Sequence, residues 1–220
     1  MPLDDRLTPH PPELPAELQR AGQVALEHDA SFAEVELVAA ELTDANARGV
    51  SFKACKLADV DLSSARLEHL SLSHCVLSDC NLANVHSSGA RVQKASVEQS
   101  RMTGIRFSEA QLSDITFSGC RVDLASFGFS KLVRVTFEDC LLTQSDFLDA
   151  ELDRVRFVGC DLTEADMRGA RLKRCELRGC DLTGLQGVSS LRGAALEWPA
   201  IVELAGVLAA ELGIEVLDDR

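Results

Sequence analysis

The chain has 220 residues, and its 46% hydrophobic and 26% charged content is typical of a folded globular protein rather than a disordered one. Its 35 acidic residues outnumber the 22 basic ones and give a formal net charge of −13. Direct nucleic-acid binding is not expected, because contacts with phosphates require a basic surface. No apolar run approaches the roughly 18 residues that a transmembrane helix needs, so no membrane association is expected either.

The first 30 residues differ in composition from the rest of the chain. They place acids and prolines where a secretory signal would have a basic and then an apolar segment. We therefore expect a cytoplasmic protein, with residues 1–30 as an N-terminal lead and cap. Because proline fits the first turn of a helix, Pro15 predicts a short helix over residues 15–22.

Residues 31–185 follow a period of five, without a slip, through 31 consecutive pentads. The second position of the pentad is Leu sixteen times and Phe eight times, and the fifth position is small or medium-sized and uncharged. All the cysteines occupy this fifth position: Cys55, Cys75, Cys80, Cys120, Cys140, Cys160, Cys175 and Cys180.

A period of five excludes both regular elements over this length. On a helix the Leu and Phe positions would spread around the whole circumference, and on a strand they would alternate between faces. A solenoid remains, in which short extended pieces are separated by corners and each coil stacks on the previous one. Eight of the nine glycines in the repeat share the fourth position, which predicts that the backbone bends there.

Segments such as DMRGA (166–170), CDLTG (180–184) and CNLAN (80–84) resemble the repeat unit of the pentapeptide-repeat proteins. The resemblance implies an all-β fold, a right-handed quadrilateral parallel β-helix with four pentads per coil and nearly eight coils. It also implies that the second and fifth positions point inward, whereas the other three face water.

With 20 residues per coil, equivalent side chains form columns. Two columns of phenylalanine are predicted, Phe107, Phe127 and Phe147 in one and Phe117, Phe137 and Phe157 in the other. Cys120, Cys140, Cys160 and Cys180 form a third. Side chains stacked along one wall do not converge tetrahedrally on an ion, so we interpret these cysteines as buried, reduced, space-filling residues. No metal and no cofactor are expected.

Catalytic machinery is not indicated. The histidines, at positions 10, 28, 69, 74 and 86, have no cysteine or acid placed to join them, and no nucleophile or phosphate-loop motif occurs. A solenoid without insertions also offers no deep cleft. The sequence therefore predicts a protein that is not an enzyme.

The C-terminal region, residues 186–220, is expected to hold a helix that begins near Pro199 and ends before Gly213. Its predicted apolar stripe consists of Ile201, Leu204, Ala205, Leu208 and Leu212. The stripe is interpreted either as a cap on the open core or as a contact between two copies. The second role is implied by the resemblance to mycobacterial-type members. Residues 214–217 are a candidate for one further strand.

Charge is distributed unevenly over the faces. The face that carries Arg91, Lys131 and Arg171 sums to about +5, and the other three are negative. Six acids near the C-terminal end of two faces are the candidate partner-binding residues, and we expect them to project into water: Asp146, Asp149, Asp161, Glu164, Asp166 and Asp181. Among these positions the only nearby base is Arg168.

Two functions remain open. The first is a structural or protein-interaction module with an unassigned protein partner. The alternative is a DNA-mimicking protein that binds DNA gyrase or topoisomerase and modulates quinolone susceptibility. The uninterrupted repeat is closer to the loop-free, mycobacterial-type fluoroquinolone-resistance pentapeptide proteins than to members with projecting loops. The negative charge is well below that of duplex DNA of the same length.

One coil, residues 86–105, breaks the pattern. Ser87, Val92, Val97 and Met102 stand where Leu or Phe dominates elsewhere. This coil buries less apolar volume, and Ser87 needs a hydrogen-bond partner. Repeat drift explains the difference, and the alternative hypothesis is a soft joint between two stiffer halves.

Overall fold

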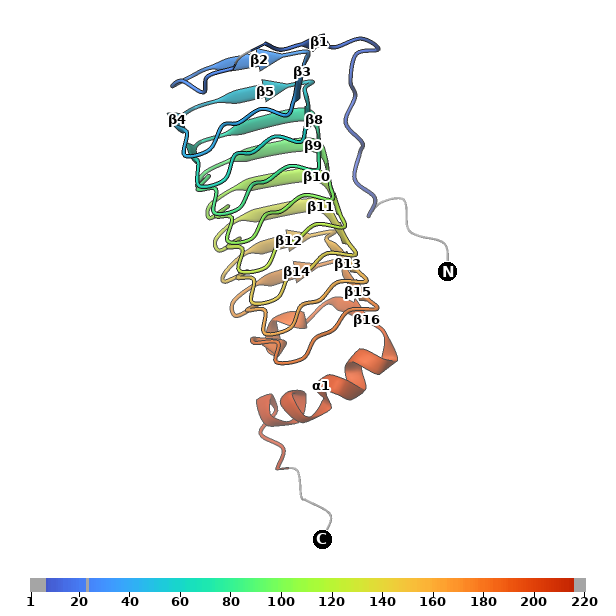
Figure 1. The fold of residues 1–220 in the computed structure, drawn as a ribbon. Coiled ribbons are helices and arrows are strands. Elements are labelled where there is room, and N and C mark those ends of the chain that lie inside the picture. Colours follow the sequence, from blue (N-terminus) through green and yellow to red (C-terminus); the bar gives the residue numbers. More distant parts are fainter. Residues whose placement is uncertain (1–6, 23, 216–220) are drawn as a thin grey trace.

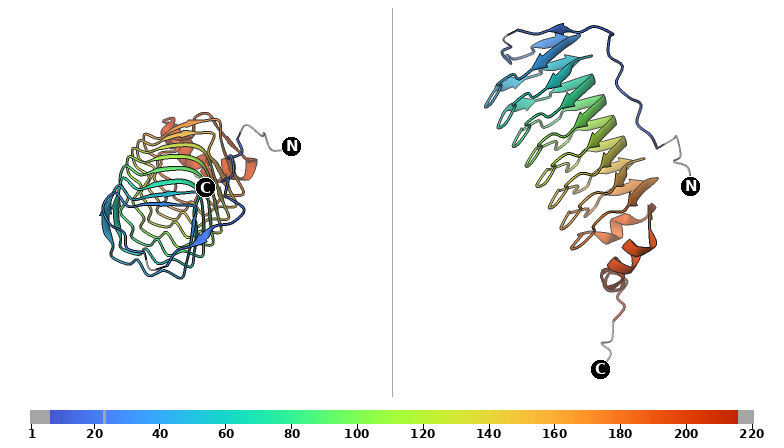
Figure 2. Two further views of the ribbon diagram at one scale, coloured as in Figure 1. Left: turned by 90° about the horizontal axis from the view of Figure 1, so that it is seen from above. Right: turned by 45° about the vertical axis from the view of Figure 1, so that its right-hand side comes forward.

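The computed structural model describes residues 7–22 and 24–215, which fold into a β-solenoid of about nine turns with a helix at its C-terminal end (Figure 1). The predicted all-β repeat fold is confirmed. Residues twenty positions apart pair in parallel, as Leu112 does with Leu132 and Phe117 with Phe137. Both views of Figure 2 show the coils stacked in one column.

The described strands are short and parallel. In chain order they are β1 (Gln19–Arg20), β2 (Ser31–Ala33), β3 (Val35–Val38), β4 (Asn46–Arg48), β5 (Ser51–Lys53), β6 (Lys56–Ala58), β7 (Arg66–Glu68), β8 (Ser71–Ser78), β9 (Arg91–Glu98), β10 (Gln111–Ser118), β11 (Lys131–Glu138), β12 (Glu151–Asp153), β13 (Arg156–Val158), β14 (Arg171–Lys173), β15 (Cys175–Arg178) and β16 (Ala194–Leu196). The 3-10 helix η1 (Val188–Leu191) precedes β16, and α1 (Trp198–Glu211) follows it. The count of about nine turns exceeds the predicted near-eight, because β1 and β16 extend the stack beyond the repeat.

Each coil contributes one pentad to each of four faces, which we number from the pentads 31–35 (face 1), 36–40 (face 2), 41–45 (face 3) and 46–50 (face 4). Faces 1 and 2 consist of strands of a 14-stranded sheet. Faces 3 and 4 consist mostly of isolated bridges followed by turns, in which the N–H of the fifth residue donates to the carbonyl of the second, as Ala165 does to Leu162.

The backbone bends at the fourth position of every pentad. All 31 of these residues have positive φ, and eight of them are glycines, as the sequence predicts. Glycine adopts this left-handed conformation without a steric penalty, whereas other L-residues bear a cost. Asp and Asn tolerate it comparatively well, and a bulky apolar residue there is unusual.

Two aromatic columns fill the core of the coils between residues 107 and 157, as predicted. Within the columns most neighbouring rings stack, with centroids 4.8 Å apart for Phe117 and Phe137 and 5.0 Å apart for Phe127 and Phe147. Phe107 is tilted against Phe127, with centroids 6.0 Å apart. Between the columns the rings meet edge to face, as Phe127 and Phe137 do at 5.9 Å. Stacked and edge-to-face pairs both add stabilisation beyond the burial of apolar area.

The coil of residues 86–105 is less well filled. An enclosed apolar cavity of about 30 Å³ is lined by Val92, Val97 and Met102 together with side chains of the adjoining coils. Ser87 is fully buried, and its hydroxyl donates to the carbonyl of Leu67 at 2.8 Å. The structure thus contains the hydrogen-bond partner expected for Ser87, and the predicted deficit of apolar volume in this coil is confirmed.

The two ends of the solenoid are covered differently. The predicted helix at residues 15–22 is wrong: this stretch is extended and contains β1, which pairs with β3. Its backbone N–H groups bond to carbonyls of the first coil, a stronger constraint than the proline signal. At the other end the predicted helix is present as α1. Ile214 and Glu215 form no strand, and residues 216–217 lie outside the described residues.

No helix within residues 7–22 and 24–215 has the length and apolar character needed to cross a membrane.

Candidate partner-binding surface

The six predicted acids lie together on faces 3 and 4 near the C-terminal end of the repeat, and we call them the acidic block: Asp146, Asp149, Asp161, Glu164, Asp166 and Asp181. Asp146 is the bridge partner of Asp166, and Asp161 is the bridge partner of Asp181. Carboxylates of the same sign are thus placed on adjacent rungs, about 4.8 Å apart along the stack. Because like charges directly opposite each other are destabilising, this arrangement has a cost for the folded state.

Face 1 arranges its charges in the opposite way. Glu151 lies between two bases, with its carboxylate 3.7 Å from Lys131 Nζ and 3.4 Å from Arg171 Nη1. Signs therefore alternate over the last three coils of this column, and the sum of about +5 for face 1 already includes Glu151. The fold thus accommodates columns in which acids and bases alternate, whereas acids of the acidic block follow one another along their columns without an intervening base.

Four carboxylates of the acidic block also close turns, so the expectation that they only project into water is incomplete. Each accepts the backbone N–H two residues ahead, at 2.7–2.9 Å: Asp146, Asp161, Asp166 and Asp181. This is the Asx-turn bond that favours Asp and Asn at such positions. Asn81 makes the same bond to Ala83 at 3.2 Å without carrying a charge. The turns therefore need the side-chain oxygen and not the negative charge.

Hydrogen bonds favour the ionised form of two carboxylates of the block. Hydrogen bonds from Thr163 hold the pKa of the Asp161 carboxyl below its usual range, and Arg168 does the same for the pKa of Asp166. Arg168 binds Asp166 at 2.6 Å. It is the only basic residue on faces 3 and 4 between residues 141 and 186, so the block retains a surplus of about five negative charges.

Helix α1 extends the acidic block. Asp181 accepts the N–H of Thr183, whose hydroxyl donates to Glu203 of α1 at 2.9 Å. A seventh carboxylate is thereby placed beside the C-terminal end of the block. No signal in the sequence indicated Glu203, because it lies outside the repeat and only the docking of α1 determines its position.

A second unpredicted feature is the strap, which we define as residues 7–18. It runs in an extended conformation along the corner between faces 1 and 2, from the C-terminal coils back to β1 (Figure 1). Glu13 binds Lys94 Nζ through its carboxylate at 2.9 Å, and its N–H donates to His74 Nδ1 at 3.1 Å. These contacts join residues up to 81 positions apart, so the repeat pattern could not reveal them.

The strap also engages a buried carboxylate. The side chain of Asp114 is 4% exposed, accepts from the backbone N–H of His10 at 3.1 Å, and lies 2.6 Å from His10 Nδ1. Arg134 binds the same carboxylate through Nε and Nη2, both at 2.6 Å. Burial alone would raise the pKa of Asp114, but the hydrogen bonds from Arg134 and His10 hold it well below its usual range.

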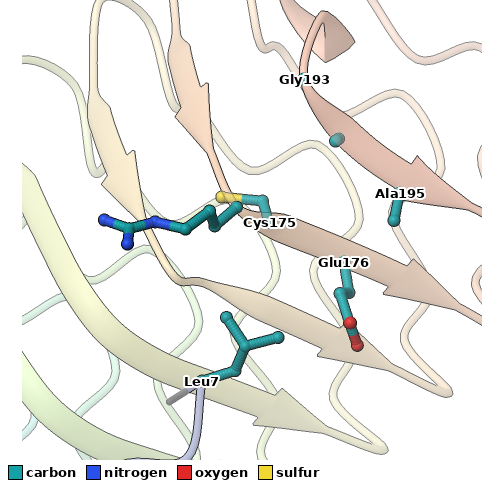
Figure 3. Close-up of a pocket in the computed structure, with 7 residues that line it drawn as sticks. Leu7, Cys175, Glu176, Gly193 and Ala195 are labelled. Atoms are coloured by element: carbon teal, nitrogen blue, oxygen red, sulfur yellow. The ribbon is translucent and has the colours of Figure 1, made fainter. Parts of the chain in front are cut away.

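The beginning of the strap lies at an open depression of about 380 Å³ near β14 and β15 (Figure 3). Leu7 is buried there, close to Cys175 and Glu176. The polar groups around it are already used by the fold: Arg174 binds Asp153 at 3.0 Å, and the Cys175 thiol bonds to the backbone. This depression therefore anchors the strap and does not present free catalytic groups.

The cysteines do more than fill space. All eight are free thiols, and each Sγ lies within hydrogen-bonding distance of backbone carbonyls, as Cys120 Sγ does 3.3 Å from Val97 O. Ser100, in the same column, bonds to Glu98 O with its hydroxyl. Burial raises the pKa of the Cys80 and Cys175 thiols, which keeps them protonated. The expectation of complete burial is wrong for Cys180, which is half-buried at the end of its column.

In the part of the chain that the structure describes, no three His, Cys, Asp or Glu side chains converge as metal ligands would. Three of the histidines take part in hydrogen bonds within the fold instead. Besides His10 and His74, His28 accepts the N–H of Arg48 through Nδ1 at 3.0 Å.

The predicted stripe of α1 is only partly turned toward the solenoid. Leu204 is buried, and Ile201 and Leu208 are half-buried beside η1. Ala205 and Leu212 are exposed. Three further apolar residues of α1 are exposed: Trp198, Val202 and Val207.

The model of the family described as "Pentapeptide repeat region" matches residues 70–147, 90–167 and 126–187, which together span more than half of the chain. The chain belongs to the pentapeptide-repeat family. This pentapeptide-repeat protein has no match among the curated proteins.

Solved structures similar to it include trypsin-treated QnrB1, a plasmid-mediated fluoroquinolone resistance protein, with 18% identity over 92% of this chain and 100% of that one, at a TM-score of 0.40. Another is HetL, a pentapeptide repeat protein involved in heterocyst differentiation regulation, from the cyanobacterium Nostoc sp. strain PCC 7120. It has 21% identity over 82% of this chain and 88% of that one, at a TM-score of 0.37.

Proposed function

We propose that this pentapeptide-repeat protein is a non-enzymatic interaction module that binds a partner protein through its acidic block. The observation that carries the proposal is the placement of Asp146 on Asp166 and of Asp161 on Asp181. Asparagine would close the same turns without repulsion, as Asn81 does. The charge is therefore an addition to what the fold needs, and it suits recognition of a basic surface.

The remaining parts of the proposal follow from the same features. A block of carboxylates on a rigid wall accelerates association with a basic partner and is screened by salt. The partner we propose is a protein, since direct binding to nucleic acid would meet this charge unfavourably. A cytoplasmic location suits eight free thiols, because a reducing compartment keeps them unpaired.

A retention experiment tests the proposal. In the six-site variant the block is neutralised with its turns preserved: Asp146→Asn, Asp149→Asn, Asp161→Asn, Glu164→Gln, Asp166→Asn and Asp181→Asn. A matched control neutralises six exposed acids of the other half: Glu34, Glu41, Asp44, Asp59, Glu68 and Asp79. We expect the immobilised wild type and the control to retain a shared set of cytoplasmic proteins that about 0.5 M salt releases. Equal retention by the six-site variant would contradict the proposal.

A second candidate function is DNA mimicry toward DNA gyrase or topoisomerase. The columns of stacked carboxylates favour it, because they place negative charges at a short, regular spacing along a rod. A supercoiling assay with and without a fluoroquinolone separates the two candidates. A DNA mimic inhibits supercoiling or alters quinolone sensitivity, and the six-site variant loses this effect. A module with another partner leaves supercoiling unchanged at every concentration.

We also propose that α1 both caps the core and joins two copies of the chain. Leu204 faces the solenoid, whereas Trp198 and Val202 remain exposed on the other side of the helix. Light scattering after size-exclusion chromatography tests this. The wild type should have twice the mass of a Val202→Glu variant, and a monomeric wild type would disprove the dimer.

A further inference from the structure

Two adjacent corners of one coil break the rule that corner residues are small or polar. Among the described non-glycine residues with positive φ, Leu124 and Phe129 are the only large apolar side chains, and both have φ of 57°. They are 56% and 61% exposed. The chain therefore bears two costs at each position, a left-handed conformation that bulky residues disfavour and an apolar side chain in water. Such local strain is typical of functional sites.

The surroundings of these residues make them one surface. Leu124 and Phe129 flank the short face-4 segment 126–128, and Gly128 is the one glycine of the repeat that is not at a corner. A Cβ at position 128 would lie only 3.3 Å from Asp146 Oδ2, so any side chain there would crowd the acidic block. The two apolar corner residues thus border a short segment of face 4 that carries no side chain at position 128. On face 3, Leu141 of the next coil is 42% exposed and lines a depression of about 320 Å³ together with Leu124.

The apolar corners are continuous with the acidic block. In the column below Leu124, Gln144 is hydrogen-bonded to Glu164 at 2.6 Å. In the column below Phe129 the next corner residue is Asp149. Each apolar corner residue is therefore followed, further along its own column, by a carboxylate of the acidic block.

We propose that Leu124, Phe129 and Leu141 form the apolar end of one docking surface whose other end is the acidic block, and that its occupant is a basic segment of a partner protein with large apolar side chains at one end. This rests on the proposed function. Charge complementarity selects the occupant: a second copy of this chain, with a net charge of −13, is disfavoured by repulsion at the block. Apolar anchors beside charged pairs are the usual composition of the energetically dominant part of an interface.

Two synthetic peptides test the proposal. One has two leucines followed by a lysine-rich tail, and the other has serines in place of the leucines and the same charge. Anisotropy titrations at low salt compare the wild type with a Leu124→Asn/Phe129→Asn variant and with a control, Val207→Gln/Ile214→Gln, which removes two other exposed apolar residues, one in α1 and one just after it. We expect the wild type and the control to bind the leucine peptide about tenfold or more tightly than the serine peptide, since burying apolar side chains contributes at this level.

The Asn variant should bind both peptides equally, at the level of the serine peptide. Asparagine tolerates positive φ, so this variant should also melt at or above the temperature of the wild type. A wild type that does not distinguish the two peptides, or an Asn variant that still does, would overturn the proposal. The six-site variant separates the two ideas. If the six-site variant binds the serine peptide as tightly as the wild type does, the proposed role of the acidic block fails. The preference for the leucine peptide over the serine peptide tests only the apolar end of the docking surface.

Discussion

The coil of residues 86–105 and the coils that carry the phenylalanine columns follow the same backbone path around different cores. The first surrounds an empty apolar space of about 30 Å³, and the second stacks rings at 4.8 Å and 5.0 Å. The backbone path is fixed by the period and by positive φ at each corner, which both regions share. The difference shows that in a solenoid the second-position side chains decide local stability without deciding shape.

The difference in stability between the two regions can be estimated from the volume of the empty space. At about 24 cal/mol per Å³, an empty space of this volume costs about 0.7 kcal/mol. The smaller side chains Val92 and Val97 add a further loss of buried area relative to Leu or Phe. Since each coil contacts only its neighbours, the deficit stays local, as a soft joint between two halves requires.

The largest effect is expected from charges placed in the two cores. Phe127→Asp removes a fully buried ring and introduces an unpaired carboxylate, and should cost about 4 kcal/mol or more in the free energy of unfolding. Val97→Asp, beside the empty space, should cost clearly less, because less apolar surface is lost. Urea denaturation followed by circular dichroism measures both. A Phe127→Asp protein that melts like the wild type would show that this ring does not point inward.

The second-largest effect on stability is expected at Asp114, which lies at the boundary between the underfilled coil and the coils with the phenylalanine columns. Asp114 lies in the first coil after residues 86–105, and its pKa is lowered in the folded state by Arg134 and His10 despite burial. A lowered carboxyl pKa contributes stability that is fully present above the unfolded value, near 3.9, and that is lost as the pH falls from there through the lowered folded value. Asp114→Asn should therefore destabilise by about 2 kcal/mol at pH 7, and this difference should shrink progressively as the pH falls below about 4.

Melting temperatures of both proteins between pH 7 and about pH 2 provide the measurement for Asp114→Asn. Parallel curves over this range would mean that the ion pair adds no pH-dependent stability.

Filling the empty space is a smaller test. Val97→Leu adds one methylene group toward it and should stabilise the protein by about 0.5–1 kcal/mol. The matched change Val122→Leu, at a fully buried second position in the well-packed region, should be neutral or destabilising because no room exists. If both substitutions have the same effect in chemical denaturation, the two regions are packed equally well.

The smallest effect is a difference in labelling rates under native conditions. Cys180, half-buried, should react first with a thiol reagent. Among buried thiols Cys80, whose N–H donates to Ser100 of the underfilled coil, should react about tenfold faster than Cys140, since its local opening costs less. Mass spectrometry of timed samples gives the order. Equal rates for Cys80 and Cys140 would favour repeat drift over a joint.

Sequence reasoning reached the repeat fold because the period of five acts on every residue from 31 to 185 at once. The positions of the phenylalanine columns, the inward cysteines and the corner glycines all follow from that one register. The underfilled coil was also visible, since Val97 and Met102 occupy positions whose environment the register defines.

The features that sequence reasoning missed depend on contacts outside the register. The extended course of residues 15–22 is set by pairing of β1 with β3, which overrides the local proline signal. Glu203 joins the acidic block only through Thr183. The Asx turns could have been inferred from the preference for Asp and Asn at the first position, but the turn geometry of faces 3 and 4 was not anticipated.

The strap also reverses the order in which the parts of this chain can be completed during synthesis. Residues 7–18 leave the ribosome before the repeat, yet Leu7 lines the same depression as Cys175 and Glu176, which are added almost 170 residues later. At about 5–20 residues per second, the N-terminal segment waits on the order of ten seconds or more for its last contact. Coils can stack as they emerge, whereas the strap is sealed only when the final coil exists. The strap can therefore dock completely only after the whole repeat has been synthesised.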